Sequence, residues 1–170
     1  MAKESVLNGK RVLAVDDEPD VLEVVKEEIT QAAPECTVET ATSYEQAVEL
    51  LVSWTYDLAI FDIMGVRGFD LLRQAVERGL PSVMLTARAM SPQALKQSID
   101  DGARAFIPKE HLGALVPFLE DVLTYEYGPA WRRILKGVEG LLNESWGPYW
   151  RKPDQAFWNE FEARISPEKK

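Results

Sequence analysis

The sequence is poor in the residues that form covalent or metal-bound cross-links. Its 170 residues include one cysteine, Cys36, and one histidine, His111. A single cysteine excludes an intramolecular disulfide, and one cysteine with one histidine cannot form a structural zinc site. Hydrophobic residues make up 46% of the chain and charged residues 28%. This composition predicts an ordered chain held together by a buried apolar core.

Long apolar runs and an excess of positive charge are also lacking. No apolar stretch is long enough to span a bilayer, and the N-terminal segment MAKESVLNGKR lacks the apolar core of a signal peptide. The 19 Lys and Arg against 28 Asp and Glu give a net charge of −9. Such a charge disfavours electrostatic binding to nucleic acid or anionic lipid. We therefore expect a cytoplasmic protein with no nucleic-acid or membrane partner.

Charge and aromatic residues are unevenly distributed along the chain. Residues 1–123 hold 11 basic and 21 acidic residues, a net −10, whereas residues 124–170 hold 8 and 7, a net +1. Four of the five tryptophans lie in these last 47 residues. We predict a main domain at 1–127 and an aromatic-rich helical extension at 128–170.

Five short apolar segments alternate with amphipathic ones in the main domain. Four are almost continuously apolar, as expected for strands buried on both faces, and the second is more polar, as expected at a sheet edge. In order they are Arg11–Val15, Thr37–Ala41, Leu58–Phe61, Ser82–Leu85 and Ala105–Ile107. The segments between them begin with helix-start signals such as Ser43 with Gln46, and Ser91-Pro92. Five β–α alternations predict an α/β protein with a doubly wound parallel sheet.

The extension has the pattern of two helices. Gly128-Pro129 is predicted to end a fifth helix and to start the next, and apolar residues then recur at helical spacing from Trp131 to Leu142. A further helix is expected at Gln155–Ile165. These helices either fold back on the main domain or form an aromatic surface for self-association or a partner. We favour the surface, because four tryptophans exceed what a simple cap requires.

Polar residues follow the predicted strands. The first strand ends in Asp16, Asp17 and Glu18, the third in Asp62, the fourth in Thr86, and the fifth runs into Lys109. The carboxyl ends of parallel strands meet at one edge, so these side chains should converge. Clustered carboxylates repel one another unless a cation joins them, and oxygen ligands favour Mg²⁺. A divalent ion beside a lysine and a hydroxyl suits phosphoryl transfer, with Asp62 on the central strand as the nucleophile.

Four segments carry a resemblance to a known family: VLAVDDEPDVLEVV (12–25), LAIFDIM (58–64), VMLTAR (83–88) and DGARAFIPK (101–109). Over about residues 10–125 the sequence resembles the CheY-like receiver domain of two-component response regulators. The resemblance implies a flavodoxin-like, five-stranded parallel sheet. It also implies a signalling phosphoprotein of a phosphorelay rather than an enzyme with a separate substrate.

The resemblance implies a role for each matching residue. Asp62 would accept a phosphoryl group from a histidine kinase or phosphotransfer protein. Asp16, Asp17 and Asp62, with the backbone carbonyl of Met64, would hold Mg²⁺.

Other positions would respond to the phosphoryl group. Thr86 and Lys109 would contact its oxygens, and Phe106 corresponds to the aromatic switch residue. The residues two positions after Asp62 and Thr86, here Met64 and Arg88, tune the lifetime of the phosphoryl group in the family.

The sequence departs from the family pattern at two places. The loop after Asp62, DIMGVRGFDLL, is two residues shorter than the family pattern and lacks a proline, so Gly65 and Gly68 are expected to supply unusual backbone angles. Glu110 stands where the family has a proline after the lysine, so the cis bond at that point should be lost.

Three other functions remain open. The shortened loop suits an inactive receiver that serves as an interaction scaffold. A flavodoxin-like nucleotide-binding protein lacks support, because no glycine-rich loop follows the first strand. A Mg²⁺-dependent phosphohydrolase with an Asp nucleophile is the third. A DNA-binding output is disfavoured by the near-neutral extension, which contains no convincing helix-turn-helix.

Overall fold

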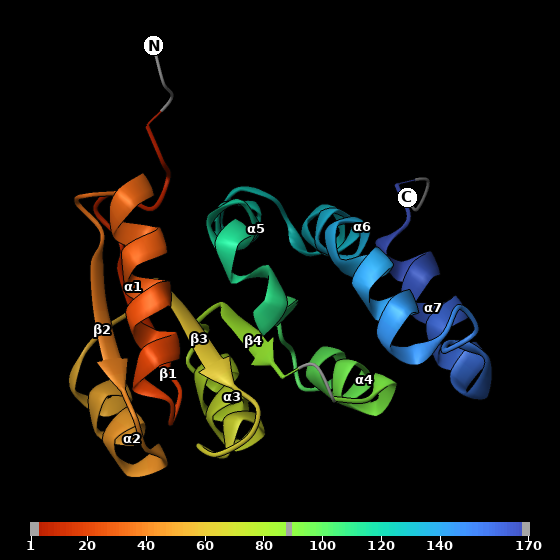
Figure 1. Cartoon of the computed structure of the whole chain (residues 1–170), viewed down its shortest axis with the longest axis horizontal. Coiled ribbons are helices and arrows are strands. Elements are labelled where there is room, and N and C mark those ends of the chain that lie inside the picture. Colours follow the sequence, from red (N-terminus) through yellow and green to blue (C-terminus); the bar gives the residue numbers. More distant parts are fainter. Residues whose placement is uncertain (1–3, 88–89, 168–170) are drawn as a thin grey trace.

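The computed structural model describes residues 4–87 and 90–167. Five strands form one parallel sheet in the order β2-β1-β3-β4-β5, which confirms the predicted fold class (Figure 1). The strands are β1 (Arg11–Val15), β2 (Thr37–Ala41), β3 (Leu58–Asp62), β4 (Ser82–Thr86) and β5 (Ala105–Pro108). Each matches its predicted segment to within one residue.

Helices cover both faces of this sheet and continue beyond it. Helix α1 packs with α5 and α2 packs with α3, as a doubly wound sheet requires. The main domain contains α1 (Pro19–Ala32), α2 (Tyr44–Ser53), α3 (Gly68–Glu77), α4 (Pro92–Asp100), the 3₁₀ helix η1 (Lys109–Ala114) and α5 (Leu115–Thr124). The extension contains α6 (Tyr127–Trp146), the 3₁₀ turn η2 (Lys152–Asp154) and α7 (Gln155–Ile165). None of the described helices is both long and apolar enough to cross a membrane.

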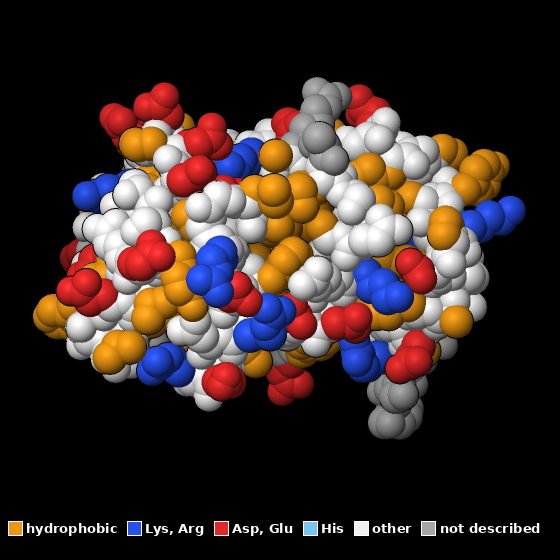
Figure 2. Space-filling view, turned by 90° about the horizontal axis from the view of Figure 1, so that it is seen from below, with side chains coloured by type: hydrophobic (Ala, Val, Ile, Leu, Met, Phe, Trp, Pro, Cys, Tyr) orange, Lys and Arg blue, Asp and Glu red, His pale blue; other side chains and the backbone are white. Residues whose placement is uncertain are grey.

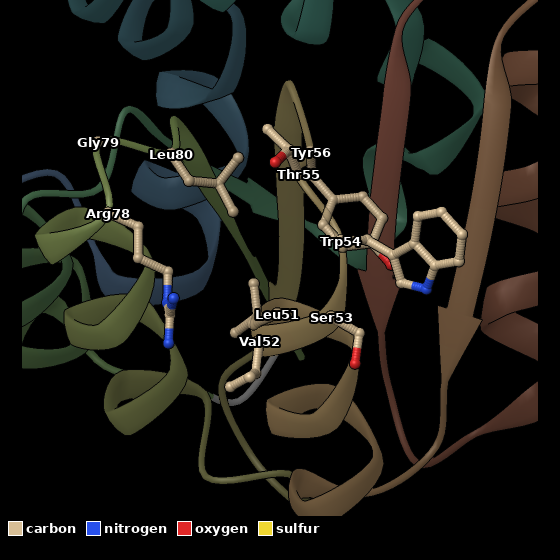
Figure 3. Close-up of a pocket in the computed structure, with 9 residues that line it drawn as sticks. All are labelled: Leu51, Val52, Ser53, Trp54, Thr55, Tyr56, Arg78, Gly79 and Leu80. Atoms are coloured by element: carbon tan, nitrogen blue, oxygen red, sulfur yellow. The ribbon is translucent and has the colours of Figure 1, made fainter.

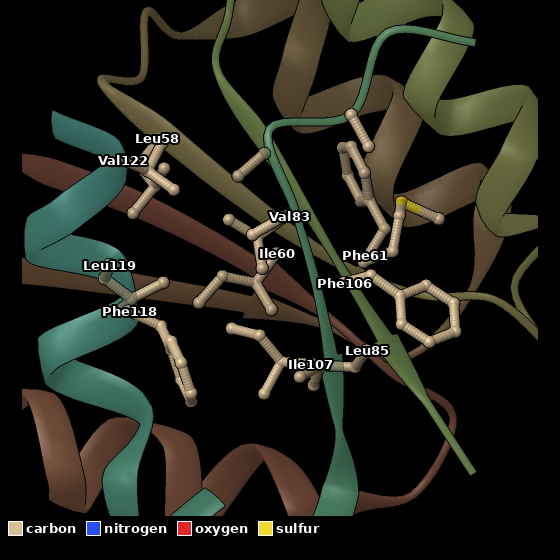
Figure 4. Close-up of a cluster of buried hydrophobic side chains, with 14 of the residues drawn as sticks. Leu58, Ile60, Phe61, Val83, Leu85, Phe106, Ile107, Phe118, Leu119 and Val122 are labelled. Carbon is tan, nitrogen blue, oxygen red and sulfur yellow. The ribbon is translucent and has the colours of Figure 1, made fainter. Parts of the chain in front are cut away.

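The strand register aligns the carboxyl ends of the strands. Val15 pairs with Phe61, and Asp62 pairs with Leu85, the residue before Thr86. Side chains alternate between the two faces of the sheet. Ile107 points toward α5 and Phe106 points the other way (Figure 4). The residues that follow each strand are thereby brought to one edge.

The two edge strands differ in exposure. β2 is partly exposed, as its polar sequence predicted. β5 is the other edge strand, yet all four of its residues are buried. Helix α6 packs against β5 and α5, so the extension covers this end of the sheet (Figure 1). Covering an edge in this way blocks pairing with a strand from another chain.

The boundary between the fifth and sixth helices differs from the prediction. Helix α5 ends at Thr124, because Tyr125 adopts an extended conformation with φ −104° and ψ 155°. Gly128 and Pro129 lie in the first turn of α6. The expectation that Gly128 ends a helix is therefore wrong. Proline fits a first turn because its missing N–H would have no intrahelical acceptor there.

The expectation of an exposed aromatic surface on the extension is also wrong for most of its tryptophans. Trp131, Trp150 and Trp158 are only 0%, 5% and 2% exposed, and Trp146 is half-buried. They belong to the same hydrophobic core as the residues of the main domain. The helical spacing of the extension agrees with the prediction. The direction in which the rings face depends on the tertiary packing, which places α6 against the main domain.

Candidate functional site

Three predicted site residues form a carboxylate cluster at the carboxyl edge of the sheet. Asp16, Asp17 and Asp62 each offer an oxygen, and these oxygens all lie within 4.8 Å of one another. Asp16 and Asp62 are buried, whereas Asp17 is exposed. The convergence expected from the strand ends is confirmed for these three residues.

Lys109 lies beside this cluster and pairs with two of its three aspartates. Its Nζ is 2.9 Å from Asp16 Oδ2, 3.3 Å from Asp62 Oδ1 and 3.0 Å from Glu18 Oε1. The backbone N–H of Glu18 donates to Asp16 Oδ1 at 2.9 Å, which fixes Asp16 at the start of α1. One ammonium therefore contacts three carboxylates. Glu18 was expected at this edge of the sheet, and its contact with Lys109 agrees with that expectation.

Burial and charge together set the proton affinities of these groups. Desolvation, followed by the charge of Asp16, raises the pKa of Asp62 to about 6, although Lys109 opposes this. Burial also raises the pKa of Asp16. Burial alone would lower the pKa of Lys109, but its hydrogen bonds to Asp16 and Glu18 outweigh that effect and raise it. Lys109 is thus a permanent cation beside carboxylates that are costly to ionise.

The donor set fits a magnesium ion. Carboxylate oxygens are the hard ligands that Mg²⁺ prefers, and a divalent cation would offset their mutual repulsion. Among the described residues, Asp16 Oδ2 has no hydrogen bond of normal geometry, although it forms an ion pair with Lys109. This buried oxygen retains capacity for a metal. Asp16, Asp17 and Asp62 are the side chains that would hold the ion.

The loop after Asp62 passes directly over the cluster. A Cβ added at Gly65 would collide with the Asp17 carboxylate, and Gly65 has φ +86°. This confirms the unusual backbone angle expected there. It also brings the backbone next to Met64 close to the acids, whereas the Met64 side chain is 62% exposed. The role of the Met64 carbonyl as a ligand stays a prediction.

Two further residues, Arg67 and Gly68, connect the shortened loop after Asp62 to α3. The unusual backbone angle expected at Gly68 is wrong, because its φ is ordinary. Glycine is needed there for space, since an added Cβ would be 2.8 Å from Ile63 Cα. Arg67 adopts the left-handed conformation at φ 55°, which is uncommon for a residue with a side chain. Its guanidinium bonds Asp70 at 2.9 Å and stacks over Tyr44 at 4.1 Å. No feature of the sequence marks Arg67, because arginine has no preference for this conformation.

Two of the remaining predicted residues, Thr86 and Phe106, lie in the neighbouring strands β4 and β5. Thr86 is buried, and its hydroxyl donates to the carbonyl of Ala87 at 3.1 Å. Phe106 is fully buried. The described peptide bonds are all trans, in agreement with the loss expected after Lys109. Arg88 lies outside the described residues.

The surface around the site is mixed in charge. Figure 2 views the molecule from the side toward which the strands point, where acidic, basic and hydrophobic side chains are interspersed. A nucleic-acid-binding face would instead gather basic side chains.

A separate hollow of about 380 Å³ lies elsewhere, between the ends of α2 and α3 and the starts of β3 and β4 (Figure 3). Its lining includes one charged residue, Arg78, and the half-exposed Trp54. It contains none of the predicted site residues, so it has no part in the carboxylate site.

Comparison with known proteins identifies the class. The model of the response regulator receiver domain matches residues 12–116, more than half of the chain. The chain therefore belongs to the response regulator receiver family, the receivers of two-component signalling. Such a domain interacts with a histidine kinase or a phosphotransfer partner.

Individual relatives agree with this assignment. The chemotaxis protein CheY of Thermotoga maritima is 33% identical over 104 residues, which are 59% of this chain and 86% of CheY. The transcriptional regulatory protein TcrA of Mycobacterium tuberculosis is 31% identical over 109 residues, 61% of this chain. The match spans only 41% of TcrA. The non-phosphorylated HemR receiver domain of Leptospira biflexa is 32% identical, with a TM-score of 0.59, over 69% of this chain and 96% of that domain.

Proposed function

We propose that this receiver accepts a phosphoryl group on Asp62 in a Mg²⁺-dependent reaction, from a histidine kinase or a phosphotransfer protein. The observation that carries the proposal is the position of Asp62. It is buried at the end of the central strand, 3.3 Å from Lys109 and in one cluster with Asp16 and Asp17. A carboxylate so placed is a nucleophile with cationic support beside it.

The transfer requires one bond to form and one to break. A carboxylate oxygen of Asp62 bonds to phosphorus, and the phosphorus–nitrogen bond to the donor histidine breaks, its electron pair staying on the imidazole. Lys109 balances the negative charge of the incoming phosphoryl group. Thr86 can donate its hydroxyl proton to a phosphoryl oxygen once it leaves Ala87. Bound Mg²⁺ would supply further neutralisation of the phosphoryl oxygens.

The product is a signalling state and not a released chemical product. A phosphoryl group adds a charge of about −1.5 to −2. We propose that the protein acts in the cytoplasm and signals through protein–protein contacts made by α4, α5, the extension, or a combination of these. It acts as a phosphoacceptor and not as an enzyme with a separate substrate.

The test is phosphorylation of the purified chain by acetyl phosphate, followed by intact mass measurement. We expect the mass of one phosphoryl group to be gained with Mg²⁺, and to be absent with EDTA or in Asp62→Asn. The matched control is Asp100→Asn, which removes an exposed carboxylate at the end of α4.

Two results would contradict the proposal. A mass gain that persists in Asp62→Asn would exclude Asp62 as the acceptor. A wild-type chain that gains no mass with Mg²⁺ would favour the interaction scaffold instead.

A further inference from the structure

The last turns of α6 lie against the residues that would respond to phosphorylation. The indole N–H of Trp146 donates to the carbonyl of Met90 at 2.5 Å, and its ring centre is 6.3 Å from that of Phe106. Between α6 and the end of β4 there is a gap of only about 10 Å³. Thr86, Phe106, Leu142 and Trp146 are among the residues that line it. Thr86, Phe106 and α6 therefore face one another across this small gap.

Ring contacts continue from Trp146 into the second helix of the extension. Trp146 and Trp150 are 5.3 Å apart, Trp150 and Trp158 are 5.0 Å apart, and both pairs meet edge to face. A change at Phe106 would thus reach the core of α7 through adjoining rings.

A polar contact fastens the same part of the extension to α4. Lys96 Nζ bonds Asp154 Oδ1 at 3.2 Å and lies 5.1 Å from the centre of the Phe157 ring. The second half of the extension is therefore held by α4 and by the neighbours of Phe106.

The first half of α6 is fastened elsewhere. The indole of Trp131 donates to the carbonyl of Ala103 at 3.1 Å, before β5 begins. Arg133 pairs with Asp121 of α5 at 3.0 Å. These contacts lie away from the carboxylate cluster. The end of α7 is attached to this same half of α6, because Phe161 meets Trp131 edge to face at 5.8 Å and Arg132 bonds the carbonyl of Ile165.

We propose that the segment from Leu141 to Phe161, which lies between the attached first half of α6 and the attached last turn of α7, is an intramolecular lid on α4 and β5 that loosens when Asp62 is phosphorylated. The proposal rests on the phosphoacceptor function given above. In the unmodified chain the Thr86 hydroxyl donates to Ala87. A phosphoryl oxygen on Asp62 is a charged and stronger acceptor, so Thr86 turns toward it.

The turn of Thr86 changes the packing under α6. It leaves an apolar void beside Phe106, and such voids are costly in a close-packed interior. Phe106 moves into the void and away from Trp146, so the ring contact between Phe106 and Trp146 is lost. The first half of α6 stays in place through Trp131 and Arg133. The second half of α6 and the start of α7 move away, so the surface of α4 and β5 that they cover becomes exposed to solvent.

The experiment is amide hydrogen exchange of the full chain with Mg²⁺, with and without acetyl phosphate, with intact mass measured on the same samples. In the phosphorylated protein we expect exchange in residues 141–161 to be at least about fivefold faster, as local opening predicts. Exchange in residues 127–137 is expected to be unchanged.

Two tryptophan variants give a matched comparison. Trp146→Phe keeps an aromatic ring but loses the bond to Met90, so exchange in residues 141–161 should be fast before phosphorylation and should increase less afterwards. Trp54→Phe alters a tryptophan that is 54% exposed at the end of α2, and it should respond as the wild type does. Protection of residues 127–137 shows that each variant is folded.

Each outcome separates the lid from the phosphoacceptor function. A full mass gain with unchanged exchange in residues 141–161 would overturn the lid and leave the function of Asp62 intact. Faster exchange throughout the chain would also overturn it, because the effect would be general destabilisation. Absence of any mass gain would overturn the phosphoacceptor function, and the lid with it.

Discussion

At the scale of single residues, the carboxylate cluster places ionisable groups where burial disfavours their charged form. Asp16 and Asp62 are buried next to each other and share one ammonium, Lys109. One lysine cannot satisfy the oxygens of three aspartates, so the cluster without metal is a cost to folding. A bound divalent cation would offset this cost.

The first prediction concerns the pH dependence of Asp62. Its pKa is raised from 3.8 to about 6 by burial and by Asp16, so the folded protein binds more protons than the unfolded chain in this window. The stability of the metal-free protein should therefore fall as pH rises from about 4 to about 6. Asp62→Asn removes this cost. At pH 7 in EDTA it should raise the free energy of unfolding by on the order of 1–3 kcal/mol.

Urea unfolding of wild type and Asp62→Asn between pH 4 and 7 measures this effect. The stability gap should close toward the acid end, where both side chains are neutral. A gap that is constant over the whole range would show that ionisation of Asp62 is not its cause.

The second prediction concerns the metal. Because Mg²⁺ would bind the folded chain and not the unfolded one, adding it in about hundredfold excess over Kd should raise the free energy of unfolding by about 2.7 kcal/mol. Asp17→Asn, which removes one exposed ligand, should abolish most of the rise in Tm. Asp20→Asn alters an exposed acid in the first turn of α1 outside the cluster, and its Tm should still rise. An equal response in both variants would exclude Asp17 as a ligand.

At the scale of elements, α6 is fitted closely to α5. A Cβ added at Gly137 would lie 2.7 Å from Cε1 of Phe118, whereas one added at Gly140 would have nothing within 4 Å. Gly137 and Gly140 lie in the same helix, where glycine is disfavoured by roughly 0.5–1 kcal/mol relative to alanine. The third prediction follows from this pair.

Gly140→Ala should stabilise the protein by about 0.5–1 kcal/mol through helix propensity alone. Gly137→Ala should lose this gain or destabilise, because the Phe118 ring has to move. Thermal unfolding of the two variants measures the difference. Equal stabilisation by both would mean that α6 does not lie against α5 as closely as the structure places it.

At the scale of the whole molecule, the receiver and the extension share one hydrophobic core. Trp131 is a central member, because it is fully buried and bonds the backbone before β5. The fourth prediction is that Trp131→Phe costs about 2–4 kcal/mol, through the cavity and the unpaired carbonyl of Ala103. Trp54→Phe, at an exposed position, should stay within about 0.5 kcal/mol.

The same variant tests whether the two parts unfold together. Circular dichroism reports mainly on the sheet and helices of the receiver, and tryptophan fluorescence mainly on the extension. Their transitions should coincide in wild type and shift together in Trp131→Phe, as expected for one cooperative unit. Two separate transitions would show that the extension is an independent unit.

The sequence by itself determined the alternation of strands and helices and the residues at the strand ends. These follow from local rules, since apolar runs, capping residues and parallel-strand geometry act over a few residues. The five strands, the helix at Gln155–Ile165 and the cluster of Asp16, Asp17 and Asp62 were predictable for this reason.

Only the tertiary structure decided where the extension lies and what its aromatic rings face. Helical spacing shows that Trp131, Ile134 and Val138 share a side, but it does not tell whether that side meets solvent, a partner or the chain's own sheet. The answer depends on β5, an edge strand that needs a cover, and on a backbone carbonyl at Ala103 within reach of an indole. The left-handed conformation of Arg67 also depends on the tertiary structure, because it results from closing a short loop over Asp17. Contacts between residues far apart in the chain set these features, and no local pattern encodes them.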